Sequence, residues 1–182
     1  MTHPRIKTAV GPTILLSSGA YFDLLDPHGS AFTIDDIAHG LSNTCRFAGQ
    51  CRAFYSVAEH CWHASFLVPV DYRLRALMHD AAEAFIGDVT RPLKSLLPDY
   101  KAIERNVEGA IQSRFGTGDW NVDPIKRADL QMLRAEQLAL MPNNGDRWAF
   151  LDDVNVADVN LRCWSPPYAR EAFRRRFDEL SR

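Results

Sequence analysis

The sequence contains 182 residues, of which 46% are hydrophobic and 24% are charged, and its formal net charge is −2. These values are typical of one globular domain with a sizeable core. The small net charge gives no sign of a nucleic-acid-binding protein, and no apolar segment is long enough to cross a membrane. The four cysteines form no C-x-x-C pair and the N-terminus has no secretory signal, so we expect a cytoplasmic protein with reduced thiols.

The first third of the chain contains a predicted hairpin and two capped helices. Residues 13–25 are expected to form one short hairpin around a Ser-Gly turn. Thr33, followed three residues later by Asp36, indicates the start of a short helix with one apolar face. Ser56 and Glu59 have the same spacing and predict a second capping box, which opens a helix that continues almost to the next proline.

Proline and glycine stops divide the rest of the chain into further helices. We expect these helices at residues 72–86, 92–97, 98–115, 124–140 and 166–180. Residues 143–164 are expected to be a loop region. The sequence therefore predicts an all-α protein, a single helical bundle with at most a small N-terminal hairpin.

A possible metal site begins with His79 and Asp80, which are consecutive in the predicted helix 72–86. Neighbouring residues differ by about 100° around a helix axis, so both side chains can lean toward one point beside the helix. Glu83 lies one turn later on the same side, where a carboxylate can take a proton from metal-bound water. A His-Asp pair is common and by itself means little, but burying three such groups without a cation would be costly.

Two residues from other helices complete the candidate ligand set. His60 lies near the start of the preceding helix, and the short connection between the two helices allows them to pack antiparallel. Asp129 lies among apolar residues of helix 124–140, where a carboxylate is a poor core residue unless it is paired or metal-bound. The competing interpretations are a core histidine for His60 and a surface carboxylate for Asp129. His63, one turn after His60, is a weaker candidate.

The ordered residues His60, His79, Asp80 and Asp129 resemble the H…HD…D signature of the HD superfamily of metal-dependent phosphohydrolases. The segments CRFAGQCRAFYSVAEHC and LMHDAAEAFIGDVTRPLK are similar to one branch of that superfamily. This branch contains bacterial 5′-deoxynucleotidases and related phage and bacterial enzymes that hydrolyse deoxynucleoside triphosphates, notably dATP. The resemblance covers about residues 21–141.

The resemblance implies a single HD domain over residues 1–182, with its core at about 21–141 and a C-terminal helix at about 166–180. It implies one divalent transition metal (Zn, Mn, Co or Fe), with Mg as a further ion on the substrate phosphates. The implied partner is a small nucleotide, without stable binding of nucleic acid or membrane. Relatives in the superfamily are dimers or larger rings, so a homo-oligomer is expected.

The resemblance also assigns roles to individual residues. The implied metal ligands are His60, His79, Asp80 and Asp129, the implied catalytic residues are Glu83 and Asp80, and the implied substrate contacts are Arg46, Phe47, Asp88 and Lys94. Arg46 and Lys94 are expected to bind phosphate, Asp88 to contact the sugar, and Phe47 to line the sugar pocket. Without the family, either cation alone would be interpreted as ordinary surface charge.

The implied reaction is attack of water on the 5′-phosphate of a deoxynucleoside monophosphate, giving nucleoside and phosphate. The monophosphatases of this branch have an Arg-Trp pair where this chain has Arg46-Phe47. This difference keeps open the alternative of a dNTP triphosphohydrolase, which releases triphosphate. A cyclic dinucleotide or ppGpp is a further possible substrate class, although the chain is short for an attached regulatory module. A non-enzymatic nucleotide-binding module is disfavoured because the metal set and Glu83 are complete.

Overall fold

A two-stranded hairpin opens the part of the chain that the computed structural model describes, residues 11–182. Strand β1 (Thr13–Leu15) pairs antiparallel with β2 (Tyr21–Asp23), which confirms the predicted hairpin. The fully buried ring of Phe22 stacks on Phe85 with 4.1 Å between the ring centroids. This contact attaches the hairpin to the helical part of the molecule.

Helices make up most of the remaining structure, so the all-α prediction is confirmed. The α-helices are α1 (Ile34–Asn43), α2 (Val57–Ala64), α3 (Arg73–Met78), α4 (Glu83–Ile86), α5 (Arg91–Ser95), α6 (Pro98–Phe115), α7 (Asp123–Leu140) and α8 (Pro166–Leu180). Among residues 11–182, the short 3-10 helices are η1 (Phe47–Gly49), η2 (Val70–Tyr72) and η3 (Ala149–Leu151). Within residues 11–182, no helix has the length and apolar composition that a membrane crossing requires.

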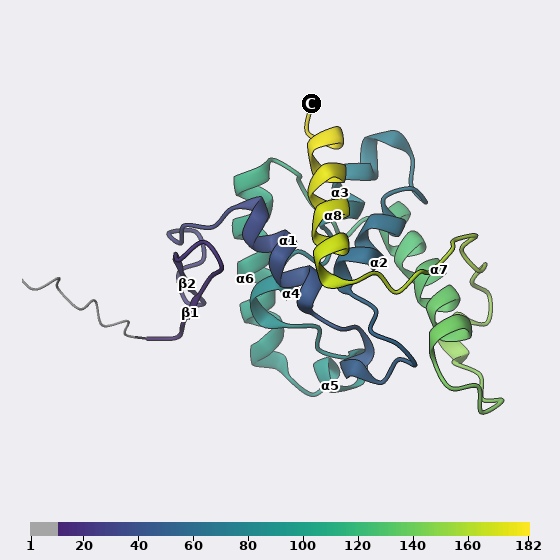
Figure 1. Cartoon of the computed structure of the whole chain (residues 1–182). Helices are drawn as coiled ribbons and strands as arrows, with labels where there is room; N and C mark the ends of the chain where they lie inside the picture. Colours follow the sequence, from purple (N-terminus) through teal and green to yellow (C-terminus); the bar gives the residue numbers. More distant parts are fainter. Residues whose placement is uncertain (1–10) are drawn as a thin grey trace, which may run out of the picture.

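The last helix holds the bundle together, because α8 packs on α1, α2 and α3 (Figure 1). On the other side, α7 packs on α2 and α3. Helices α1 and α4 approach so closely that a Cβ atom on Gly40 would lie 2.6 Å from the backbone oxygen of Ala84. A glycine is therefore required at this crossing. The crossing fixes α4, which begins with Glu83, against the core.

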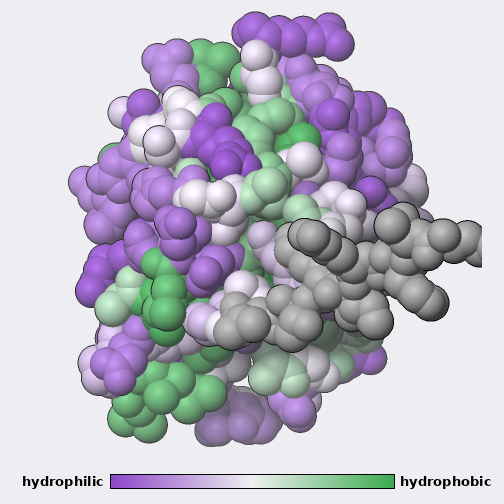
Figure 2. All heavy atoms as spheres, turned by 90° about the vertical axis from the view of Figure 1, so that its left-hand side faces the viewer, coloured by the Kyte–Doolittle hydropathy of each residue, from purple (hydrophilic) through white to green (hydrophobic). Residues whose placement is uncertain are grey.

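Figure 2 shows a mostly hydrophilic face on the side of the hairpin, with apolar groups gathered toward its lower edge. Figure 1 labels α5 at that lower end of the molecule. The exposed apolar residues of α5 and the turn after it are Leu93, Leu96 and Leu97. The main core lies inside the bundle, where the fully buried residues include Ile37, Leu41 and Leu77.

The first predicted capping box is present in full. The side chain of Thr33 accepts a hydrogen bond from the backbone N–H of Asp36, and the Asp36 carboxylate accepts one from the backbone N–H of Thr33 at 3.0 Å. The same carboxylate accepts the backbone N–H of Ser18 at 3.0 Å. Helix α1 and the turn of the hairpin are therefore linked by one buried side chain.

Only one of the two hydrogen bonds of the second predicted capping box is present. Ser56 does cap α2, but the Glu59 carboxylate does not return to it. Glu59 instead accepts three backbone N–H groups, those of Arg162 at 2.8 Å, Cys163 at 3.1 Å and Trp164 at 2.6 Å. We call this contact the Glu59 clamp. Helix α2 also ends at Ala64, earlier than predicted, where the side chain of Ser65 bonds back to the carbonyl of Trp62.

The predicted helix 72–86 is not continuous, because it breaks between α3 and α4. In the break the backbone bonds join residues three apart, from the Ala81 N–H to the Met78 oxygen and from the Glu83 N–H to the Asp80 oxygen. This tighter winding is of the 3-10 type. It frees the Ala76 carbonyl, which accepts a hydrogen bond from Nδ1 of His79 at 2.8 Å.

The other predicted helix bounds differ from the structure by at most two residues. Helix α5 covers Arg91–Ser95 rather than residues 92–97, and α7 begins at Asp123 with Val122 as its N-cap. Helix α6 ends where predicted, at the left-handed Gly116. Such one- and two-residue differences are usual at helix ends.

We expect Glu59→Gln to lower the free energy of unfolding by about 2–3 kcal/mol, the contribution of hydrogen bonds to a charged acceptor. The amide would turn an N–H donor toward a backbone donor of residues 162–164. Urea unfolding measures the change, and Glu171→Gln on the exposed side of α8 is the matched control, with a change below about 0.5 kcal/mol. Equal stability of both variants would contradict a stabilising clamp.

Candidate metal centre

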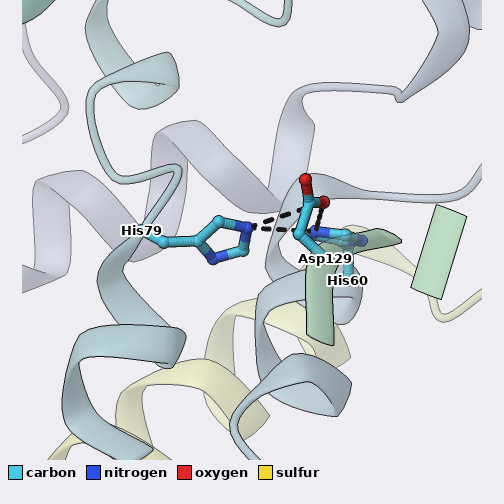
Figure 3. A group of neighbouring side chains, drawn as sticks. All are labelled: His60, His79 and Asp129. Carbon is cyan, nitrogen blue, oxygen red and sulfur yellow. Dashed lines mark hydrogen bonds and ion pairs between the residues drawn. The ribbon is translucent and has the colours of Figure 1, made fainter. Parts of the chain in front are cut away.

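The four predicted metal ligands lie together where α2, α7 and the turn after α3 meet. Nε2 of His60 lies 3.3 Å from Nε2 of His79, 3.5 Å from Oδ2 of Asp80 and 3.3 Å from Oδ1 of Asp129. Nε2 of His79 lies 3.3 Å from Oδ2 of Asp80 and 3.9 Å from Oδ1 of Asp129. Figure 3 shows His60, His79 and Asp129 pointing toward one another. We call these four side chains the donor cluster.

The spacing of the donor cluster fits one small cation. Ligand atoms held at about 2.1 Å by a tetrahedral cation lie about 3.4 Å from one another. The distances from Nε2 of His60 to the other three donors and from Nε2 of His79 to Asp80 are between 3.3 and 3.5 Å, and the ligand atoms of His60, His79 and Asp129 all lie within 4.8 Å of one another. Two imidazoles with two carboxylates are a donor set suited to Zn²⁺, Mn²⁺, Fe²⁺ or Co²⁺. The residues present therefore fit a divalent transition metal.

The hydrogen bonds of the two imidazoles give a second argument for a cation. Nδ1 of His60 contacts Oε1 of Glu136 at 2.7 Å, and Nδ1 of His79 contacts the Ala76 carbonyl. A carboxylate and a carbonyl can only accept, so both Nδ1 atoms carry a proton. The two Nε2 lone pairs then face each other and two carboxylates. Such an arrangement is stable only when a positive charge, a proton or a metal ion, lies among them.

The pKa shifts of His79 and Asp129 also indicate that positive charge is favoured at this site. Burial lowers the pKa of His79, but Asp80 and Cys61 oppose it and raise that pKa well above its usual value. For Asp129, burial raises the pKa, while hydrogen bonds with His60 and His79 hold it well below the usual range. Asp129 therefore acts as an ionised partner of the imidazoles, and its side chain is only 34% exposed.

A carboxylate that the sequence analysis missed supports the cluster from behind. Glu136 is fully buried on α7, and its two oxygens contact His60 and, at 3.1 Å, Nε of Arg46. Burial raises the pKa of Glu136, but Arg46 and His60 outweigh this and lower it. A carboxylate that orients a ligand histidine is common around metal sites. The sequence could have pointed to Glu136 through its spacing, because Glu136 lies two helical turns after Asp129 on the same face of the helix.

Arg46 joins this buried network rather than lying free in solvent. Besides Glu136, its guanidinium approaches Oδ2 of Asp80 at 3.5 Å. Burial lowers the pKa of Arg46, but Glu136 and Asp80 raise it well above its usual value, so the charge is retained. The residues that follow, Phe47 and Ala48, both have left-handed backbone with φ of 56° and 51°. Such strained backbone is found preferentially at functional sites.

Two neighbours of the cluster differ in their fit as ligands. Cys61 places Sγ 3.9 Å from Nδ1 of His79, and Cys61, His79 and Asp80 form a second group whose ligand atoms lie close enough to hold a metal. Burial raises the pKa of the Cys61 thiol to about 11. His63 lies apart from the cluster, with Nε2 3.8 Å from Glu59 and its ring stacked on Trp164. The structure therefore does not bring the weaker candidate His63 to the site.

Glu83 lies at the edge of the cluster and is buried. Among the described residues, its Oε2 atom is buried without a hydrogen-bond partner. Burial and, next, the charge of Asp80 raise the pKa of Glu83 well above its usual value. A buried carboxylate oxygen without a partner is costly unless a ligand or water occupies the space beside it. Glu83 is thus placed to interact with a bound molecule.

A cavity of about 790 Å³, here called the main cavity, opens beside the cluster. It is lined by Asp80, Glu83 and Asp129 and by all four predicted substrate contacts, Arg46, Phe47, Asp88 and Lys94. Lys94 is held by Glu104, with 2.6 Å between Nζ and Oε1. Burial raises the pKa of Asp88, and Arg46 opposes this shift. A smaller cavity of about 510 Å³ lies beside His79 and Asp129 and is lined by α6 and α7 residues.

Comparison with known proteins finds relatives along nearly the whole chain. The "Uncharacterized protein YfdR" of Escherichia coli is 40% identical over 165 residues, which cover 90% of this chain and 93% of that protein. An uncharacterized protein of Rhodobacter capsulatus is 36% identical over 183 residues, covering 91% of this chain and 93% of that protein. No known protein-family profile matches the chain.

We expect purified protein to bind one divalent transition metal, and Asp129→Ala to lose it during dialysis, because a ligand of the cation is removed. Glu136→Gln should retain the four ligands but bind the metal about 10- to 100-fold more weakly. Metal analysis and competition with a chelator measure both effects. Asp35→Asn, an exposed change on α1, is the control and should behave as wild type. Wild-type affinity in Asp129→Ala would disprove the ligand assignment.

Proposed function

This chain belongs to the family that includes YfdR, and we propose that it is a divalent-metal phosphohydrolase of the HD type acting on deoxynucleoside 5′-monophosphates. The observation that carries the proposal is the donor cluster beside a cavity that is also lined by cationic side chains. Hydrolysis would release a nucleoside and inorganic phosphate.

The metal would be held by His60, His79, Asp80 and Asp129. When bound, a divalent cation polarises the phosphoryl oxygen and lowers the pKa of a water molecule. Arg46 is held near Asp80 by its contact with Glu136, so its positive charge faces the place where the phosphate would lie.

Glu83 is proposed as the general base. Its unpartnered Oε2 would accept a proton from the attacking water as the new bond from oxygen to phosphorus forms. The bond from phosphorus to the 5′ oxygen breaks in the same reaction, and the leaving oxygen takes up the proton that Glu83 received, which gives the nucleoside hydroxyl and restores the Glu83 carboxylate.

The remaining predicted contacts would orient the substrate in the main cavity. Lys94 lines the main cavity and would add a second positive charge for the phosphate, while its Nζ is held by Glu104. Burial raises the pKa of Asp88 and the backbone of Phe47 opposes this shift, and both residues line the main cavity. Asp88 and Phe47 would lie next to the sugar.

A dNTP triphosphohydrolase is the second candidate, and one observation favours it. Arg91 and Lys101 line the main cavity together with Arg46 and Lys94. Four cations exceed what a single phosphate requires and would suit a triphosphate chain. The proposal further includes a cytoplasmic homo-oligomer formed by a single domain, with Zn, Mn, Co or Fe at the cluster and Mg on the substrate phosphates.

The reaction itself can be tested with purified protein, each of the metals Mn²⁺, Co²⁺ and Mg²⁺, and panels of nucleotides. We expect phosphate and nucleoside from deoxynucleoside monophosphates. Release of inorganic triphosphate from dNTPs would support the second candidate instead. If only cyclic dinucleotides or ppGpp are hydrolysed, both candidate functions would be wrong and these molecules would be the substrates. No turnover with any metal would favour a non-enzymatic binding module.

For Glu83→Gln we expect bound metal to remain and kcat to fall by about 10²- to 10⁴-fold, because the amide cannot accept the proton. Metal analysis and initial rates on the same preparation separate these effects. Glu108→Gln, which removes a carboxylate at the smaller cavity, is the matched control and should retain wild-type kcat. Unchanged turnover in Glu83→Gln would remove this residue from the mechanism.

A further inference from the structure

The main cavity is lined by aromatic side chains as well as by the charged groups of the donor cluster. Trp148 and Phe150 line it together with Phe47. The ring centroids of Phe47 and Trp148 are 6.3 Å apart, and those of Trp148 and Phe150 are 6.2 Å apart with 24° between their planes. We call these three residues the aromatic rim. Two of them belong to residues 143–164, a segment to which the sequence analysis gave no role.

The aromatic rim is only partly covered by the protein. Phe150 is 50% exposed, and the guanidinium of Arg91 lies 5.0 Å from the centroid of its ring. A second guanidinium, that of Arg46, lies 5.5 Å from the ring of Phe47. Rings that are flanked by cations and open to a cavity suit a planar ligand that carries negative charge at one end.

The segment is held in place by its own contacts, so the rings lie at a defined position. Leu151 is fully buried, and its N–H bonds to the Trp148 carbonyl at 2.7 Å. Further along, the Ala157 N–H reaches the Gln131 carbonyl of α7, and the Glu59 clamp holds residues 162–164. Trp148 and Phe150 are therefore presented by a segment that is attached at both sides.

We propose that Trp148 and Phe150 form a stacking subsite for the nucleobase, so that these two rings make this enzyme selective for substrates that carry a base. This inference rests on the proposed function and extends it. Asp80 and Asp129 line the same cavity as the two rings, so one ligand can reach from the donor cluster to the aromatic rim. A cavity of about 790 Å³ is of the size usual for small-molecule sites.

The ring spacing decides how the base stacks. A base inserted between two rings needs about twice a contact distance of ~3.5 Å. The 6.2 Å between Trp148 and Phe150 is too short for this. The base therefore stacks on one ring of the pair, with the second ring supporting the first. Stacking of this kind accepts every base, because each has a flat π surface.

The first test compares a deoxynucleoside 5′-monophosphate with 2-deoxyribose 5-phosphate, which has the same phosphate and sugar but no base. We expect wild type to prefer the nucleotide, and Trp148→Ala to reduce the ratio of the two kcat/KM values about tenfold or more. Trp148→Phe should keep most of the preference. Tyr168→Ala removes an exposed aromatic residue on α8, outside the main cavity, and should leave the ratio unchanged.

A second test needs no hydrolysis and so separates this inference from the proposed function. A deoxynucleoside without phosphate should quench tryptophan fluorescence in wild type, and Trp148→Phe should lose that quenching. Quenching without phosphatase activity would leave the stacking subsite standing and overturn only the proposed reaction. An unchanged kcat/KM ratio in both Trp148→Ala and Phe150→Ala would overturn the subsite. A change of oligomeric state with an unchanged ratio would also overturn it and assign the rings to contact with a second copy.

Discussion

The structure depends on one electrostatic constraint, that four electron-pair donors from three parts of the chain face one another in a largely buried space. Nε2 of His60, the central donor, is within 3.5 Å of the other three. Without a positive charge between them, their repulsion would drive α2, α7 and the turn after α3 apart. A cation reverses the sign of this interaction and makes the same contacts hold the bundle together.

Behind the donors, a buried ion network keeps their orientation fixed. Glu136 lies between Arg46 and His60, so one carboxylate satisfies a guanidinium and an imidazole at the same time. Breaking one member of such a network would leave an uncompensated buried charge. The network also positions Arg46, whose other end faces Asp80 and the main cavity. The same few side chains therefore hold the metal ligands in place and direct the positive charge of Arg46 toward a bound phosphate.

The main cavity combines two kinds of surface that suit different parts of one molecule. Its lining includes the carboxylates of Asp80, Glu83 and Asp129 together with Arg46, and it also includes the rings of Trp148 and Phe150. Residues 143–164 return along α7 to the Glu59 clamp, and this path brings the two rings to the same cavity as the charged groups. Charged groups and flat apolar rings in one cavity match the chemistry of a nucleotide.

By itself the sequence determined the helical class, the hairpin, the cap at Thr33 and most helix ends, because these follow from spacing and backbone preference within a few residues. Through the resemblance to the HD superfamily it also predicted four donors and four cavity residues, and the structure brings these residues together. Only the tertiary structure decided four other features. These are the helix break after Met78, the contact of Glu136 with His60, the binding of a distant backbone segment by Glu59, and the position of Trp148. In the last three of these, the partners lie far apart in sequence, and only packing of the helices shows which buried group satisfies which.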